Sequence, residues 1–141
     1  MIRYQAKVYR DGETYSVEFP DLPGCFSSGK NKQDALSHAR EALSLYLEEA
    51  RDPRWDVPRA KSRKGNQYHW ITPYADVAIP LMIRQARLKH SLSQNKLAKL
   101  LNITVQQLQK LEMPRKSNPT VRTLAEISRV LNEQLSISLV A

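Results

Sequence analysis

The chain has few of the residues on which disulfides, metal sites and membrane spans depend. It contains a single cysteine, Cys25, among 141 residues, so it can form no intramolecular disulfide and no zinc site built on several thiolates. Charged residues interrupt every apolar segment, and no run approaches the roughly 18 apolar residues of a transmembrane helix. Residues 1–7 lack the apolar region of a secretory signal. We therefore expect a cytoplasmic protein that does not associate with a membrane.

The sequence also lacks the clusters that catalysis and metal binding require. Hydrolytic metal sites draw carboxylates from adjacent elements, yet the first predicted strand, residues 2–9, contains no acidic residue. His38, His69 and His90 lie in different predicted elements, without a cysteine or histidine at ligand spacing. Cys25 has no recognisable base and suits a small core residue. We expect no metal, no cofactor and no enzymatic activity.

Acidic residues are scarce at one end of the chain only. The formal net charge is +8, from 22 Lys and Arg against 14 Asp and Glu. Residues 1–50 carry six basic and eight acidic side chains, residues 51–79 carry six and three, and residues 80–141 carry ten and three. This distribution favours two modules with different partners, the second of which binds a polyanion.

Residues 1–75 predict a small α+β unit of order βββαβ. Alternating apolar residues and the turn dipeptide Asp11-Gly12 predict a hairpin, and Asn31 is a suitable helix N-cap. The predicted elements are the hairpin over 2–19, a strand over 25–29, a helix over 35–47 and a strand over 67–72. Residues 51–66 hold two prolines, one glycine and six basic residues, which predicts a solvated basic loop rather than a phosphate site.

The segment from Tyr15 to Gly29 carries a resemblance to a known family. It reads Tyr-x-Val-x-Phe-Pro-Asp-Leu-Pro-Gly-Cys-x-Ser-x-Gly and is followed by a predicted helix; in this it resembles the N-terminal domain of HicB antitoxins. The resemblance implies a degenerate RNase H-like fold and a partner, the small toxin ribonuclease HicA. The mildly acidic residues 1–50 suit a basic partner, because complementary charge speeds encounter. The toxin-binding face is unknown within 1–75, and the candidate contacts are Glu18, Asp21 and Leu22.

Residues 76–141 predict an all-α unit with a short C-terminal strand. The expected features are a helix from Pro80 to His90, a helix capped by Ser93 and ended by Asn102, a helix with a Thr104–Gln107 capping box, a helix begun by Asn118 to Thr120, and a strand over 135–139. The middle two helices, joined by about three residues, make a helix-turn-helix. The strand could pair with its copy in a second subunit or join a sheet.

A second resemblance lies in this unit. The residues that carry it are Gln94-x-x-Leu97-Ala98-x-x-Leu101-Asn102-Ile103-Thr104-x-x-x-Leu108-x-x-Leu111-Glu112. They resemble the DNA-binding domain of the Cro/C1 repressor family, with Asn102 where that family usually has glycine and Val105 where a polar base-reading residue often stands. The resemblance implies a phosphate contact from Gln94 and a structural ion pair between Arg87 and Glu112. The alternative is a four-helix bundle with no role in DNA binding.

Position by position, the same resemblance implies further DNA contacts. The residues expected to face the major groove are Val105, Gln106, Gln109 and Lys110. Gln can pair with adenine, Lys with guanine, and Val can meet a thymine methyl. The residues expected to contact the DNA backbone are Thr104, Arg115, Lys116 and Asn118. Such readers span half-sites about one helical turn, ~34 Å, apart, so we expect a homodimer, or a tetramer built from it.

The sequence thus predicts an antitoxin of a type II toxin-antitoxin system. It would inhibit a HicA-like mRNA-cleaving toxin and repress its own operon by binding operator double-stranded DNA. One alternative is a stand-alone transcriptional repressor whose N-terminal domain senses a ligand. A second, an RNase H-like nuclease, would require a metal-binding acid cluster.

Overall fold

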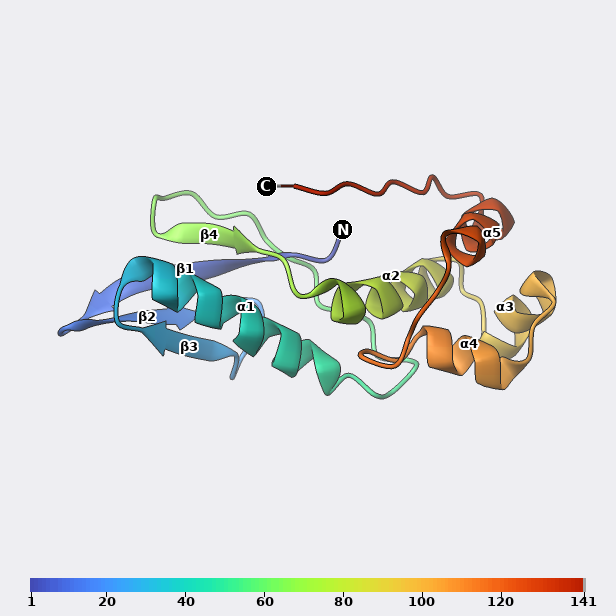
Figure 1. The fold of residues 1–141 in the computed structure, drawn as a ribbon, viewed down its shortest axis with the longest axis horizontal. Helices are drawn as coiled ribbons and strands as arrows, with labels where there is room; N and C mark the ends of the chain where they lie inside the picture. Colours follow the sequence, from blue (N-terminus) through green and yellow to red (C-terminus); the bar gives the residue numbers. More distant parts are fainter. Residues whose placement is uncertain (141) are drawn as a thin grey trace.

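The computed structural model describes residues 1–140 and has a mixed α+β architecture (Figure 1). An antiparallel sheet lies at one end of an elongated molecule and short helices lie at the other. The strands are β1 (Tyr4–Asp11), β2 (Thr14–Glu18), β3 (Phe26–Gly29) and β4 (Tyr68–Ile71). The helices are α1 (Lys32–Glu48), α2 (Ala75–Lys89), α3 (Gln94–Leu101), α4 (Val105–Leu111) and α5 (Val121–Leu131). Among the described residues, none of the helices combines the length and hydropathy that a bilayer crossing requires.

The four strands form one sheet in the order β3-β2-β1-β4, with every neighbouring pair antiparallel. Val8 of β1 lies opposite Val17 of β2, and Tyr4 of β1 lies opposite Ile71 of β4. These four side chains are buried in one core with the apolar face of α1, which covers this side of the sheet. The predicted βββαβ order is confirmed.

The start of α1 follows from local chemistry. Asn31 Oδ1 accepts the backbone N–H of Asp34 at 2.8 Å, so the predicted N-cap is confirmed. Gly29 ends β3 directly against the first turn of α1, where a Cβ atom would collide with the backbone of Ala35. A larger residue at position 29 would therefore push the helix away from the sheet.

The molecule contains two apolar cores that share α2. The first lies between the sheet and α1, and the second lies among the helices α2 to α5. Val77 and Leu81 of α2 belong to the first core, whereas Ile83 belongs to the second. The predicted boundary between residues 75 and 76 falls at the start of α2, and this helix packs against both parts.

Pro80 lies inside α2 and does not open it, so the predicted start of this helix is wrong by five residues. Proline has no N–H, so the carbonyl of Asp76, four residues earlier, loses its usual helical donor. The backbone N–H of Arg115 donates to that carbonyl at 2.9 Å. The helix continues through Pro80 because a distant segment supplies the missing hydrogen bond.

The three short C-terminal helices begin as the sequence predicts, and α3 also ends where it is expected to end. Ser93 Oγ accepts the backbone N–H of Lys96 at 3.1 Å, and Asn102 ends α3 in the left-handed conformation with φ 56°. Thr104 and Gln107 form the expected capping box at the start of α4. Thr120 caps α5.

The predicted C-terminal strand is not formed. Residues 133–140 adopt no helix or strand, and Ile137 and Leu139 are 62% and 101% exposed. A single strand has no partner for its backbone hydrogen bonds, and this segment pairs with no strand of the described sheet. Joining that sheet is therefore excluded in the single chain, whereas pairing with a second copy stays a prediction.

Candidate functional site

The first candidate surface is built by α3 and α4, which are joined by residues 102–104. Leu97 and Ala98 of α3 pack against Leu108 of α4, and all three are buried. Because these short helices bury their apolar residues against one another and against α2 and α5, α4 presents its other face to solvent.

The solvent face of α4 carries most of the residues expected to read bases. Gln106, Gln109 and Lys110 are exposed, and within residues 1–140 their side chains make no hydrogen bond or ion pair. Val105 differs, because it is half-buried and packs against the second core. The structure thus places three free polar side chains on one short helix, with an apolar residue at its start.

Gln94 lies at the first position of α3 and is half-buried. Its Nε2 donates to Glu112 Oε2 at 3.0 Å, and Arg87 Nη2 donates to the same oxygen at 2.9 Å. The Arg87 and Glu112 side chains are 4% and 1% exposed, so the ion pair implied by the second resemblance is present and buried. This network joins the start of α3 to the end of α4 and fixes the two helices relative to α2.

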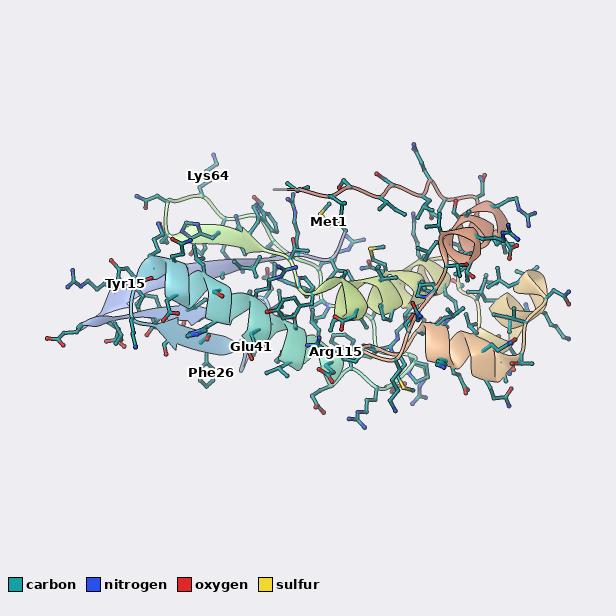
Figure 2. The ribbon with its side chains drawn as sticks, in the orientation of Figure 1. Met1, Tyr15, Phe26, Glu41, Lys64 and Arg115 are labelled. Carbon is teal, nitrogen blue, oxygen red and sulfur yellow. The ribbon has the colours of Figure 1, made fainter. Side chains whose placement is uncertain are left out.

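The residues after α4 fall into two groups. Lys116 and Asn118 are exposed, and Thr104 is exposed at the start of α4. Arg115 instead binds carboxylates of its own chain: its Nη1 lies 2.9 Å from Asp76 and its Nε lies 3.2 Å from Glu48. In Figure 2 Arg115 lies where the end of α1, the start of α2 and the segment after α4 meet.

Arg84 is a structural residue that sequence reasoning missed. It is 4% exposed, and its guanidinium donates to the carbonyls of Ala50 at 2.7 Å, Asp52 at 3.2 Å and Glu112 at 3.0 Å. Burial lowers the pKa of Arg84, with Glu112 acting in the opposite direction. Its position three residues after buried Leu81, on the inner face of α2, is the signal that could have revealed it.

The second candidate surface is the face of the sheet that α1 does not cover. The loop 51–66 crosses part of this face and contains no helix or strand, as predicted. It is not freely solvated, however. Tyr4 Oη donates to the carbonyl of Pro58 at 2.6 Å, and Gln5 Nε2 donates to the carbonyl of Arg63 at 3.2 Å.

Asp21 anchors this loop. Its carboxylate accepts hydrogen bonds from the Arg63 guanidinium at 2.7 Å and from the Lys61 backbone N–H at 2.8 Å. The Arg63 hydrogen bond lowers the pKa of Asp21, and the Lys61 amide lowers it further. The sequence could not have shown this contact, because about forty residues separate the partners.

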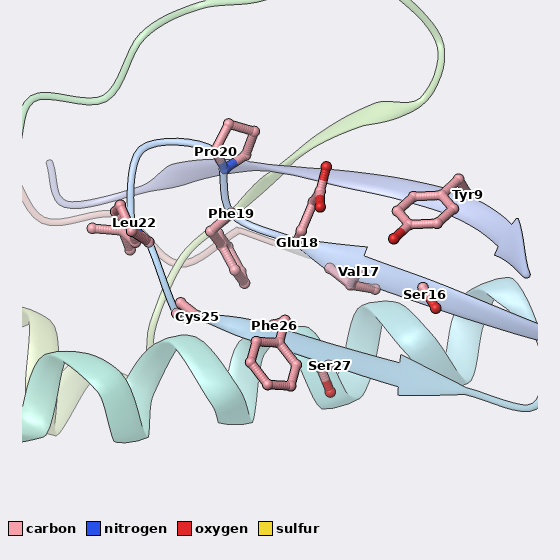
Figure 3. Close-up of a pocket in the computed structure, with 12 residues that line it drawn as sticks. Tyr9, Ser16, Val17, Glu18, Phe19, Pro20, Leu22, Cys25, Phe26 and Ser27 are labelled. Carbon is pink, nitrogen blue, oxygen red and sulfur yellow. The ribbon is translucent and has the colours of Figure 1, made fainter.

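Beside the loop, the uncovered sheet face contains a groove of about 490 Å³ (Figure 3). Of the three candidate toxin contacts, Glu18 lines this groove and is exposed, whereas Asp21 is occupied by Arg63. Leu22 is 0% exposed and belongs to the first core. Its backbone turn exposes Pro23 and Gly24 instead, so Leu22 supports the surface from beneath.

The residues considered for metal binding and nucleophilic chemistry can be located in the structure. Among the described residues, no group of three His, Cys, Asp or Glu could hold a metal ion. Cys25 is buried, and burial raises the pKa of its thiol to about 11, so the thiol is protonated at neutral pH.

Comparison with known proteins places the whole chain in context. Residues 4–123 match the family described as HicB_like antitoxin of bacterial toxin-antitoxin system. The chain is 25% identical over 136 residues to antitoxin HicB 2 of Photorhabdus laumondii, an alignment that covers 96% of this chain and 95% of that protein. It is 30% identical over 102 residues to a 14.9 kDa protein of Haemophilus phage HP1, covering 72% and 71% of the two chains. A UPF0150 protein of Thermoplasma acidophilum is 36% identical over 59 residues, 41% of this chain and 86% of that one.

Proposed function

Because the chain belongs to the family of HicB-like antitoxins of bacterial toxin-antitoxin systems, we propose that it has two binding activities. Its N-terminal sheet unit binds and inhibits a HicA-like toxin ribonuclease. Its α3–α4 unit binds operator double-stranded DNA as a Cro/C1-type helix-turn-helix and represses the chain's own operon.

The observation that carries the DNA-binding proposal is the exposed face of α4. Three exposed polar side chains without partners lie on a helix whose other face is anchored by buried residues. They belong to residues 80–141, which hold ten basic and three acidic residues. The major groove of DNA accommodates a helix of this kind, with polar side chains that can reach base edges and basic residues nearby. In this proposal Gln106, Gln109 and Lys110 read base edges.

Backbone contacts complete the proposed interface. Thr104, Lys116 and Asn118 are exposed and hold the register on the phosphates. Gln94 presents its backbone N–H at the start of α3 while its side chain braces Glu112. Val105 contacts a thymine methyl from the edge of the second core. Arg115 has a positioning role in this proposal and does not contact DNA itself, because its guanidinium is bound by Asp76 and Glu48.

The exposed C-terminal segment supports the proposed dimer. Ile137 and Leu139 are apolar, alternate with serines and are exposed in the single chain. Antiparallel pairing of this segment with the same segment of a second copy would satisfy its backbone groups and cover these side chains. A two-fold dimer would in turn present two copies of α4 to two half-sites.

The test is co-expression of the full chain with the small protein encoded by the neighbouring gene. We expect the two to co-purify, the growth arrest caused by the neighbour to be relieved, and the purified chain to retard DNA from its own promoter. Failure of co-purification and of rescue would overturn the antitoxin proposal. Retardation of promoter DNA without either effect would support a stand-alone repressor instead.

A further inference from the structure

The sheet face opposite α1 carries an aromatic groove that the fold does not use. The register sets Tyr9 opposite Ser16 and Glu18 opposite Phe26, so these four side chains share the face that points away from α1. Their neighbours Val8 and Val17 point to the other side and are buried. We call the hollow over β1, β2 and β3 the Phe26 groove. Its exposed lining residues are Tyr9, Glu18, Pro20, Pro23, Gly24 and Phe26.

The aromatic side chains of the groove are exposed to an unusual degree for strand residues. Phe26 is 72% exposed and Tyr9 is 40% exposed. Trp70, on the same face, is also 40% exposed, but the Arg3 guanidinium stacks over its ring at 4.5 Å. Lys7 Nζ likewise lies 5.6 Å from the centroid of the Tyr9 ring. No such cation covers Phe26 among the described residues. The uncovered Phe26 ring beside a hollow, with the Tyr9 ring next to it, marks a contact surface rather than a scattered surface residue.

The wall of the groove is rigid. The backbone between Phe19 and Cys25 closes on itself: Phe19 N–H donates to the carbonyl of Cys25 at 3.1 Å, and Cys25 N–H donates to that of Leu22 at 3.0 Å. Leu22 anchors the turn in the first core. Since the wall is already ordered, a partner that fills the groove loses little free energy to ordering it.

One carboxylate in the groove indicates the chemistry of the partner. Glu18 is the only ionisable group with a formal charge that lines the groove, and its nearest cation, Lys7 Nζ, lies at 3.7 Å with both side chains well exposed. At the adjacent hairpin turn, Asp11 and Glu13 are exposed acids and Arg10 is an exposed base. A complementary partner therefore presents an apolar side chain flanked by a basic one.

We propose that the Phe26 groove is the docking site of the toxin, and that it receives an apolar side chain of the toxin while Glu18 pairs with a neighbouring basic residue. This inference rests on the proposed toxin-binding function. An RNA-cleaving enzyme needs basic side chains to hold its polyanionic substrate. If Glu18 pairs with one of these side chains, the antitoxin covers part of the surface with which the toxin binds RNA.

The position of the groove sets a further condition. It lies over β1 to β3, at the end of the molecule opposite α3 and α4 (Figure 1). A toxin in the groove leaves the exposed face of α4 open. The two proposed surfaces therefore do not overlap on one chain, and the proposal allows toxin and operator to occupy it together.

The test uses the full chain and the toxin encoded beside it. Phe26→Ser and Glu18→Lys should each weaken toxin binding by about tenfold or more, as expected for central contacts, when titrated calorimetrically. Glu18→Gln should lower the association rate and its salt dependence with a smaller effect on dissociation. Leu45→Ser is the matched control, because Leu45 is 54% exposed on α1, away from the groove.

Each outcome is decisive. Folding of the variants is checked by thermal unfolding and by operator retardation, both of which should match the wild type. Unchanged toxin affinity in Phe26→Ser and Glu18→Lys would overturn the groove assignment even if the wild type binds toxin. A change in oligomeric state with unchanged toxin affinity would also overturn it and assign the groove to a second copy. Absence of toxin binding by the wild type would instead defeat the proposed function.

Discussion

The backbone N–H of Arg115 donates to the carbonyl oxygen of Asp76 at 2.9 Å, across 39 residues of chain. The same arginine pairs its guanidinium with the Asp76 carboxylate at 2.9 Å and adopts a positive φ of 66°. The segment after α4 is thereby tied to the first turn of α2. Since α2 also packs against the sheet unit, this contact helps to set the orientation of the proposed DNA-reading helices relative to the first core.

Replacement of Arg115 by alanine should lower the free energy of unfolding by about 1 kcal/mol, because partly exposed ion pairs contribute little more. Alanine keeps the Cβ atom and therefore the backbone strain that arginine already has at positive φ. Arg115→Gly should recover part of this loss, since glycine adopts positive φ freely. Urea unfolding measures both values. Equal stability of the alanine and glycine variants would show that backbone strain plays no role.

Arg87→Met should be far more damaging, by about 3–5 kcal/mol, because it leaves the Glu112 carboxylate buried without its cation. The double variant Arg87→Met/Glu112→Leu should recover a large part of that loss. Arg122→Met, on the exposed side of α5, is the control and should unfold like the wild type. A single variant as stable as the double variant would contradict this assignment of the buried pair.

Gln106→Ala combined with Lys110→Ala should abolish specific operator retardation while toxin neutralisation remains intact. Lys64→Ala, an exposed loop change at the sheet end, should leave operator binding unchanged. Loss of toxin rescue together with DNA binding would refute separate binding surfaces.

Ile137→Ser combined with Leu139→Ser should shift the chain from dimer to monomer in sedimentation velocity and weaken binding to a two-half-site operator. The stability of the monomer should not fall, because both side chains are exposed in the single chain. Val121→Ser, at another exposed apolar position, serves as the comparison. An unchanged dimer would assign self-association to a different surface.

Asp21 should make stability depend on acid pH. Its hydrogen bond with Arg63 lowers the pKa of the folded state below the ordinary value of 3.8. The resulting stabilisation is present above that ordinary value and is lost as the pH falls through the folded-state pKa. Urea unfolding between pH 7 and pH 3 should show a steeper acid loss for the wild type than for Asp21→Asn. Parallel curves would count against this carboxylate as the anchor of the loop 51–66.

Toxin-binding residues were the least predictable part of the candidate site. The sequence singled out Leu22 within a characteristic string, but the turn directs this side chain into the first core. Phe26 was assigned to a strand correctly, and its exposure depends on strand register and on which face α1 covers. Neither property can be read from one strand alone.

The sequence by itself determined the local elements. The caps at Asn31, Ser93 and Thr104 and the left-handed Asn102 involve groups within about four residues of one another, so their chemistry is legible in order along the chain. Only the tertiary structure decided the surroundings and hydrogen-bond partners at Pro80, Arg84 and Asp21. Their partners lie 28 or more residues away. In each case packing brings a distant hydrogen-bond donor or acceptor to a group that would otherwise lack a partner. This allows a proline inside a helix, a buried arginine and an anchored basic loop.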